Sequence, residues 1–207
     1  MDATALQPLD SVEVLLVRHG QTEWNVARRF LGRSDIPLDS VGRAQAAAVG
    51  AVLRGLSPTA VYSSPLHRAA DTAREIGPPE LVAALAEMDM GELEGLSAGE
   101  CRARWPGLLQ AWQDAPAGVV IPGGETLAQV QARIVPAFWT LVGAHAPGDR
   151  VVIVTHQLAL ASLLCGLSGR PLSEFRSFGH RNCAYTTLRA RDRVEIIAVD
   201  QGDHLPA

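Results

Sequence analysis

Lysine is absent from the 207-residue sequence, and all 18 basic residues are arginine. This absence excludes several classes of enzyme that depend on an amine side chain. Walker A nucleotide-binding proteins and protein kinases need a lysine at the phosphates, and aldolases or pyridoxal enzymes need one to form a Schiff base. Codon bias is the simplest cause of the absence, so most of the arginines need no function.

The sequence also has a small net charge, few cysteines and no apolar run long enough to span a membrane. The net charge of −4 argues against nucleic acid or an anionic membrane as a partner. Cys101, Cys165 and Cys183 are far apart and lack C-x-x-C spacing, which is typical of reduced thiols in a cytoplasmic protein. The apolar stretch 158–167 is too short to cross a bilayer, and residues 1–11 lack a signal-peptide pattern. We therefore expect a cytoplasmic protein with no membrane partner.

The order of apolar runs predicts a single α/β domain over residues 1–207. Residues 12–17 and 150–155 are β-rich and apolar, a pattern typical of strands buried on both faces of a sheet. Their alternation with helical segments favours a three-layer α/β/α sandwich with a mostly parallel central sheet and an antiparallel edge strand. Residues 97–122, interrupted by prolines, are predicted to form a small helical cap insertion.

Turn and cap signals predict the remaining elements. Asp39 is a typical N-cap for a helix that ends near Gly55, and Pro65 suits the first turn of the next helix. The other helices are predicted at 125–144 and 157–166, and the other strands at 60–63, 185–190 and 194–199. The last two strands are expected to pair antiparallel at the sheet edge, where they could support a homodimer.

Two histidines directly follow the two buried strands. His19 comes after the first of them, and His156 comes after the second. Because ligands of open α/β sheets bind beyond the carboxyl ends of the strands, both side chains are predicted at the same rim. This placement favours a binding or catalytic role for the two histidines over a surface or core position.

Arginines near these strand ends predict an anion site. Arg18 beside His19 needs an anionic partner if it is buried, and Gly20 lets a ligand approach the backbone. Arg68 lies one turn into the helix after the next strand, and two guanidinium forks match a phosphate dianion in charge and geometry. Asn25 could donate to the same anion. The alternatives are a helix cap for Asn25 and a surface position for Arg68.

An isolated acid completes the set of candidate residues. Glu87 lies in an apolar setting, where desolvation would raise the pKa of its carboxyl group and suit it to general acid catalysis. Asp89, Glu92 and Glu94 compete for the same role, and their spacing alone does not choose among them.

An ordered set of segments resembles the histidine phosphatase superfamily, in its phosphoglycerate-mutase-like branch. The segments are RHGQTEWN (18–25), SDIPLD (34–39), SSPLHRAADTA (63–73), EMDMGELEG (87–95), GGET (123–126) and TH (155–156). R-H-G alone is a weak match, whereas the ordered set is specific and covers nearly the whole chain.

The resemblance implies a role for each matched residue. His19 matches the nucleophile that becomes phosphohistidine, Glu87 matches the proton donor, and His156 is the second catalytic histidine. The matched phosphate-binding residues are Arg18, Asn25 and Arg68. The predicted substrate contacts are Gln21, Thr22 and Gln157. Glu94 would be structural, and a backbone carbonyl is expected to hold the second ring nitrogen of His19.

Two positions depart from the family's pattern. Gln157 stands where the family usually has glycine after the second histidine, so the approach of the backbone to phosphate can differ there. Leu93 replaces a common tryptophan, which is expected to alter packing more than chemistry.

The resemblance implies a phosphomonoesterase that hydrolyses a small phosphorylated metabolite without a metal or other cofactor. One alternative is a phosphoglycerate mutase, and another is a non-catalytic phosphoester-binding protein. The mutases resemble a longer version of this chain, whereas the segment between Glu87 and His156 is compact here. The predicted cap also lacks an adjacent arginine pair that could hold a phosphoglycerate carboxylate. Both features favour hydrolysis.

Overall fold

A central sheet organises the protein, for which the computed structural model describes residue 7 and residues 10–205. Within these residues the strand order is β3-β2-β4-β1-β5-β6. The strand β1 (Val12–Arg18) pairs in parallel with β4 (Arg150–Thr155), and β4 pairs in parallel with β2 (Ala60–Ser63). The two strands predicted from apolar runs are therefore neighbours at the centre of the sheet.

The strand directions change on the other side of β1. There β5 (Tyr185–Ala190) runs antiparallel to β1, and β6 (Val194–Gln201) runs antiparallel to β5. At the opposite edge the short strand β3 (Glu80–Leu81) continues the parallel part. The mostly parallel sheet with an antiparallel edge is confirmed, and its last strand extends further than the predicted 194–199.

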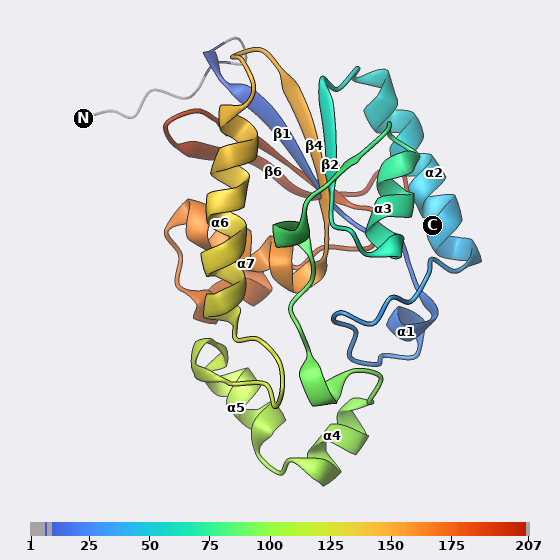
Figure 1. The fold of residues 1–207 in the computed structure, drawn as a ribbon, viewed down its shortest axis with the longest axis vertical. Coiled ribbons are helices and arrows are strands. Elements are labelled where there is room, and N and C mark those ends of the chain that lie inside the picture. The colour runs from blue at the N-terminus through green and yellow to red at the C-terminus, as the bar shows by residue number, and fades with distance from the viewer. Residues whose placement is uncertain (1–6, 8–9, 206–207) are drawn as a thin grey trace.

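Helices cover both faces of this sheet (Figure 1). The helices α2 (Ser40–Gly55) and α3 (His67–Arg74) pack on one face. The helices α6 (Leu127–Gly143) and α7 (Gln157–Ser168) pack on the other. The arrangement is the predicted three-layer α/β/α sandwich.

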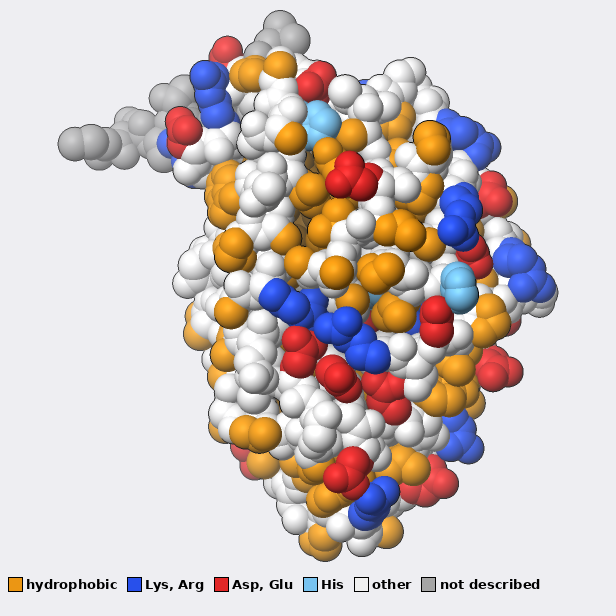
Figure 2. All heavy atoms as spheres, viewed as in Figure 1, with side chains coloured by type: hydrophobic (Ala, Val, Ile, Leu, Met, Phe, Trp, Pro, Cys, Tyr) orange, Lys and Arg blue, Asp and Glu red, His pale blue; other side chains and the backbone are white. Residues whose placement is uncertain are grey.

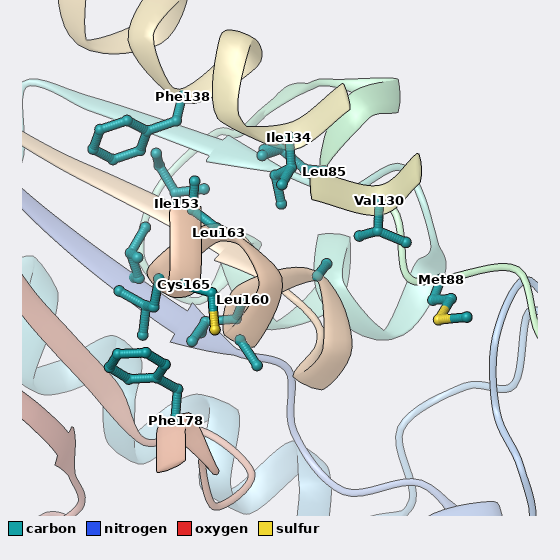
Figure 3. Packing of buried hydrophobic residues seen from close by; sticks show 14 of the residues in the cluster. Leu85, Met88, Val130, Ile134, Phe138, Ile153, Leu160, Leu163, Cys165 and Phe178 are labelled. Carbon is teal, nitrogen blue, oxygen red and sulfur yellow. The ribbon is translucent and has the colours of Figure 1, made fainter. Parts of the chain in front are cut away.

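The side chains of β1 alternate between the two layers, because successive residues of a strand point to opposite faces. Leu15 and Val17 pack in the cluster that contains α2 and α3, whereas Val14 and Leu16 pack with α6 and α7. Figure 3 shows the second cluster, in which Phe138 of α6 points toward the sheet. All four β1 side chains are at most 2% exposed, so the strand is buried on both faces.

The predicted helix ends are partly confirmed. Asp39 is the N-cap of α2, and its Oδ1 accepts a hydrogen bond from the backbone N–H of Gly42 at 2.7 Å. The expectation that Pro65 lies in the first helical turn is wrong, because the following Leu66 is still extended and is the N-cap of α3. Thr126 caps α6, so that helix begins slightly later than predicted.

Two short helices occupy residues 97–122, which we call the cap segment. They are α4 (Ala98–Arg104) and α5 (Leu108–Asp114), followed by the 3₁₀ turn η4 (Pro116–Gly118), and they lie beyond the end of the sheet (Figure 1). The remaining short elements are α1 (Glu23–Val26), η2 (Ala83–Leu85), η3 (Gly91–Leu93) and η5 (Leu172–Phe178). Among the described helices, none has the length and apolar content that a membrane crossing requires.

Candidate active site

The two strand-end histidines lie side by side. Because β1 and β4 are neighbouring parallel strands, His19 and His156 emerge at the same rim of the sheet. Their ring centroids are 5.0 Å apart, and both side chains are buried. The backbone N–H of His19 donates to the carbonyl of Thr155 at 3.0 Å, which extends the strand pairing into the site.

Hydrogen bonds to the rings decide which nitrogen atoms can react. Nδ1 of His19 lies 2.7 Å from the carbonyl oxygen of Gly20. Because a carbonyl only accepts, Nδ1 carries the proton and Nε2 keeps its lone pair, as expected from the sequence. Nε2 of His156 lies 2.7 Å from Oγ of Ser64, while its Nδ1 is buried without a hydrogen-bond partner in the described part of the chain.

Burial and positive charge keep both imidazoles neutral. Burial lowers the pKa of His19 well below its ordinary value, and Arg68 and Arg18 lower it further, against the opposing effect of the Gly20 carbonyl. Burial, followed by Arg68 and His19, likewise lowers the pKa of His156 well below its ordinary value. A neutral imidazole at His19 is the form that can act as a nucleophile.

Arg68 is a fully buried cation. Its guanidinium donates to the carbonyls of Gly32 at 2.7 Å and Ser34 at 2.9 Å, whereas its Nε has no partner among the described residues. Burial lowers the pKa of Arg68 to about 10, so the side chain remains charged at neutral pH. The surface position that was the alternative for Arg68 is therefore wrong.

Arg18 supplies a second cation with unused donors. Its Nη1 donates to the carbonyl of His180 at 2.5 Å, and its buried Nε has no partner in the described chain. Burial lowers the pKa of Arg18, while the charge of Glu87 opposes this shift. Two cations whose described hydrogen-bond partners are neutral carbonyls favour the binding of an anion between them.

Glu87 is held against the amino end of α7. Its Oε1 accepts from the backbone N–H groups of Met88 at 2.8 Å and Ala159 at 2.9 Å, and its Oε2 accepts from Leu158 at 3.1 Å. The side chain is 4% exposed and lines the same cavity as His19. The structure therefore places this carboxyl group where an acid could reach a ligand of His19.

Two of the competing acids point elsewhere. Oδ1 of Asp89 accepts from the backbone N–H of Gly91 at 2.8 Å, within its own turn. Glu92 forms an exposed ion pair with Arg104 of the cap segment. Neither acid lines the cavity that contains His19.

Glu94 organises the loop that holds Arg68. Its two carboxylate oxygens accept from the backbone N–H groups of Arg33 at 2.5 Å and Ser34 at 2.6 Å. The carbonyls of Gly32 and Ser34 in this loop are the acceptors for Arg68. Glu94 therefore has a structural position, as the resemblance implies.

Arg133 of α6 supports the backbone around Glu87. Its Nε donates to Oε1 of Glu125 at 2.8 Å, and its two Nη atoms donate to the carbonyls of Ala86 at 2.8 Å and Glu87 at 2.9 Å. Glu125 also accepts from the backbone N–H of Asp89 at 2.9 Å. The sequence did not predict that Arg133 and Glu125 support Glu87, because no local pattern indicates that Arg133 and Glu87 meet.

Asn25 can serve both as a helix cap and as a donor to an anion, the two roles that its sequence position allows. Its Oδ1 accepts from the backbone N–H of Thr22 at 3.1 Å, and the two residues form a capping box at the start of α1. Asn25 also lines the cavity, and its Oδ1 accepts a further hydrogen bond from Nδ2 of Asn182 at 3.4 Å. The amide can therefore cap the helix through its oxygen and donate to a ligand through its nitrogen.

The predicted substrate contacts Gln21 and Thr22 are turned away from the cavity. Nε2 of Gln21 donates to Oδ2 of Asp39 at 3.0 Å, and Thr22 is fully buried as the N-cap of α1. Neither residue lines the cavity, whereas Gln157 does. Thr22 therefore contacts Asn25 as its helix cap, and substrate contacts by Gln21 and Thr22 stay predictions.

A cavity of about 160 Å³ opens in front of His19. Arg18, Asn25 and Glu87 contribute polar atoms to its lining, and Phe30 and Met90 are among its apolar walls. Its volume and mixed lining fit a small anion that carries a short organic group.

Ser64 is a site residue that sequence reasoning missed. It directly follows β2, as His19 and His156 follow their strands, and it is fully buried against the ring of His156. The same rule that located the histidines, a polar residue directly after a buried strand, would also have found Ser64.

Comparisons with known proteins agree with this geometry. A family model described as the histidine phosphatase superfamily (branch 1) matches residues 14–199. Phosphoserine phosphatase 1 of Hydrogenobacter thermophilus is 32% identical over 191 residues, which cover 90% of each chain. The probable phosphoglycerate mutase GpmB of Salmonella choleraesuis is 33% identical over 182 residues, covering 86% of this chain and 84% of that protein.

A solved structure matches the fold as well. Mycobacterial glucosyl-3-phosphoglycerate phosphatase in complex with VO3 superimposes with a TM-score of 0.84 and 31% sequence identity. The match covers 92% of this chain and 99% of that one. The likeness therefore extends over the sheet, both helix layers and the rim that carries the two histidines.

Proposed function

Because this chain belongs to branch 1 of the histidine phosphatase superfamily, we propose that it hydrolyses a small phosphomonoester through a phosphohistidine on His19. The observation that carries the proposal is the state of the His19 ring. The Gly20 carbonyl holds Nδ1 and leaves the Nε2 lone pair free, while the positive charges of Arg68 and Arg18 act on the ring. A nucleophile in a positive pocket suits attack on a phosphate dianion.

The first step transfers the phosphoryl group to the protein. Nε2 of His19 attacks phosphorus in line with the ester oxygen, so an N–P bond forms as the P–O bond breaks. Glu87, in its protonated form, gives its proton to the departing alkoxide. The free alcohol leaves, and Glu87 becomes a carboxylate.

The second step returns the protein to its starting state. The Glu87 carboxylate takes a proton from a water molecule as the water attacks phosphorus. The N–P bond breaks, inorganic phosphate is released, and the His19 lone pair is restored. One acid therefore serves both steps, which requires it to stay beside the reacting phosphorus.

The remaining polar residues balance the charge of the phosphoryl oxygens. Arg18 and Arg68 supply two permanent positive charges, and Asn25 supplies a neutral donor. If the hydroxyl of Ser64 donates to Nε2 of His156, then Nδ1 of that ring carries a proton and becomes a further donor. This is the role we assign to the buried Nδ1 that has no described partner.

A phosphoglycerate mutase is the second candidate, and the likeness to a probable mutase favours it. A mutase must hold a phosphoglycerate carboxylate and keep water away from phosphohistidine. The only exposed arginine described in the cavity lining is Arg29, and it already lies 3.5 Å from Glu100. Because Arg18 is assigned to the phosphate, the described lining leaves only the paired Arg29 for a carboxylate, which supports hydrolysis over mutase activity.

The substrate we propose is a small phosphorylated metabolite rather than nucleic acid, in agreement with the net charge of −4 and the small cavity. Relatives named for phosphoserine and for glucosyl-3-phosphoglycerate mark carboxylated phosphomonoesters as the first compounds to test. A homodimer through the edge strand β6 and a cytoplasmic location stay predictions.

Hydrolysis of p-nitrophenyl phosphate, compared with interconversion of 2- and 3-phosphoglycerate, tests the proposal. The wild-type protein should release phosphate and form an acid-labile phosphoenzyme. His19→Asn should abolish both, lowering kcat/KM by roughly 10³-fold or more. His67→Asn, at a 68% exposed histidine, is the matched control and should behave as wild type. Full activity of His19→Asn would overturn the mechanism, and interconversion without hydrolysis would favour the mutase.

A further inference from the structure

The rim loop (residues 179–184), which joins η5 to β5, contacts Arg18 and His19. Its His180 carbonyl accepts from Nη1 of Arg18 at 2.5 Å. Its Asn182 donates through Nδ2 to the carbonyl of His19 at 2.9 Å. The rim loop therefore contacts both the cation and the backbone of the nucleophile, and its position determines where the Arg18 guanidinium lies.

Gln157, the first residue of α7, holds this loop from the cavity side. Its Oε1 accepts from the backbone N–H of His180 at 3.0 Å, and its Nε2 donates to the Phe178 carbonyl at 3.4 Å. The backbone of His180 therefore donates its N–H to Gln157 and accepts from Arg18 at its carbonyl. We propose that Gln157 is a positioning residue that orients Arg18 for phosphate binding through the backbone of His180.

The ring of His180 makes this connection stiff. Its Nδ1 lies 2.9 Å from the carbonyl of Phe178, its Nε2 lies 2.5 Å from Oγ1 of Thr186 in β5, and the residue is 5% exposed. With the ring anchored, the two peptide groups of His180 have little freedom to turn. Removing the Gln157 amide leaves a buried N–H without its acceptor, and relieving that cost requires moving the carbonyl that holds Arg18.

The amide side chain at position 157 is what makes this connection. Glycine, which the family usually has after the second histidine, has no side chain that could reach the rim loop. The glutamine amide reaches it and remains neutral, so it adds no negative charge beside the phosphate. A carboxylate at the same place would compete with the phosphate for Arg18.

The test measures phosphate binding, because this inference rests on the proposed function. The dissociation constant of inorganic phosphate is measured by calorimetry on the full chain for wild type and Gln157→Met, which keeps side-chain length but removes the amide. We expect binding to weaken by about three- to tenfold. Gln131→Met is the matched control, since Gln131 is also half-buried and donates to a backbone carbonyl, that of Ser162, away from the site. It should bind phosphate as wild type does.

A double-mutant cycle with Arg18→Lys separates positioning from direct contact. If Gln157 acts through Arg18, Gln157→Met should add little once Arg18→Lys has already displaced the cation. The inference is overturned if Gln157→Met leaves phosphate affinity unchanged, or if it weakens binding by the same factor in both backgrounds, as a direct contact would. If thermal unfolding indicates that Gln157→Met is not folded, Gln157→Ala takes its place.

Measurements on the wild type distinguish a failure of the proposed function from a failure of the role assigned to Gln157. A wild type that neither binds phosphate nor hydrolyses p-nitrophenyl phosphate contradicts the proposed function itself. An active wild type with an unchanged Gln157→Met contradicts only the role of Gln157.

Discussion

Arg68 and His156 are fully buried and hydrogen-bonded to backbone carbonyls or a buried hydroxyl, whereas the charges of the cap segment pair at the surface. In the ion pair between Arg104 and Glu92, for example, the side chains are 57% and 50% exposed. Figure 2 shows such acidic and basic side chains next to one another on the lower part of this face. Exposed pairs contribute little to stability, while a buried cation without its partners is costly.

The cap segment contributes Cys101, Val119 and Ile121 to the core cluster, but its helices bury little else, since Cys101 is the one buried residue of α4 and α5 has none. The ring of Trp112 meets that of Phe175 edge to face, with centroids 5.7 Å apart, and the Trp112 carbonyl accepts from Arg176 at 2.7 Å. Val120 is 68% exposed. The two regions therefore differ in how firmly their side chains are held. We infer that the buried residues around Arg68 and His156 fix the geometry of the reaction, whereas the sequence of the cap segment can vary to suit different leaving groups.

Arg68→Lys is expected to have the largest effect on activity. The planar guanidinium of arginine can donate to two carbonyls and a phosphate at the same time, whereas the ammonium group of lysine cannot reproduce this geometry. We expect kcat/KM for p-nitrophenyl phosphate to fall by about 10²-fold or more, although the charge is kept. Arg54→Lys is the control, since that arginine is 52% exposed and pairs with Glu75 at the surface. If Arg68→Lys and Arg54→Lys lowered kcat/KM equally, the buried arginine would not differ in function from the exposed one.

Glu125→Gln should have a smaller effect, because it weakens the support of Glu87 without touching the phosphate. We expect kcat to fall by about tenfold with little change in the affinity for inorganic phosphate. Glu174→Gln, in an exposed pair with Arg170, is the matched control and should be silent. A loss of phosphate affinity equal to the loss in kcat would argue against a role through Glu87.

The buried histidines should make stability fall in acid. The pKa values of His19 and His156 lie well below the ordinary 6.5 in the folded protein, so the unfolded chain binds protons first as the pH drops below 6.5. Stability is full above this value and should fall below it by up to about 1.4 kcal/mol per pH unit for each histidine.

Thermal unfolding at a series of pH values measures this slope. His156→Asn should reduce the slope below pH 6.5, whereas His67→Asn, at an exposed position, should leave it unchanged. A slope that is identical in all three proteins would mean that the buried imidazoles do not control acid stability.

Arg104→Gln in the cap segment should have the smallest effect. Because its pair with Glu92 is exposed, we expect the free energy of unfolding to change by less than about 1 kcal/mol. The value of kcat/KM for p-nitrophenyl phosphate should stay within about twofold of wild type. A loss comparable to that of Arg68→Lys would show that the two regions are coupled more tightly than their contacts indicate.

The strands and their ends were predictable because they depend on near neighbours. Apolar runs identified β1 and β4 as buried on both faces, and the rule for strand ends placed His19 and His156 at one rim. The N-cap at Asp39 follows from the same kind of local signal. Pro65 was misplaced by a short distance, because a proline is compatible with both a first turn and the residues just before it.

The acids and amides of the site were not predictable in the same way. Spacing left Glu87, Asp89, Glu92 and Glu94 open, and only the resemblance chose among them. The structure separates them because the partners of Glu87 at the start of α7 lie 71 and 72 residues further along the chain. The side chain of Gln21, which was expected at the substrate, donates to Asp39.

By itself, the sequence determined the layers of the fold, the rim where the histidines meet and the phosphate chemistry that its motifs resemble. These features depend on alternation, caps and residue types within short segments. Only the tertiary structure decided that Glu87 rather than Glu92 lines the cavity, and that Gln157 holds the rim loop. Both features depend on contacts or a cavity shared by segments that are distant in the chain and adjacent only after folding.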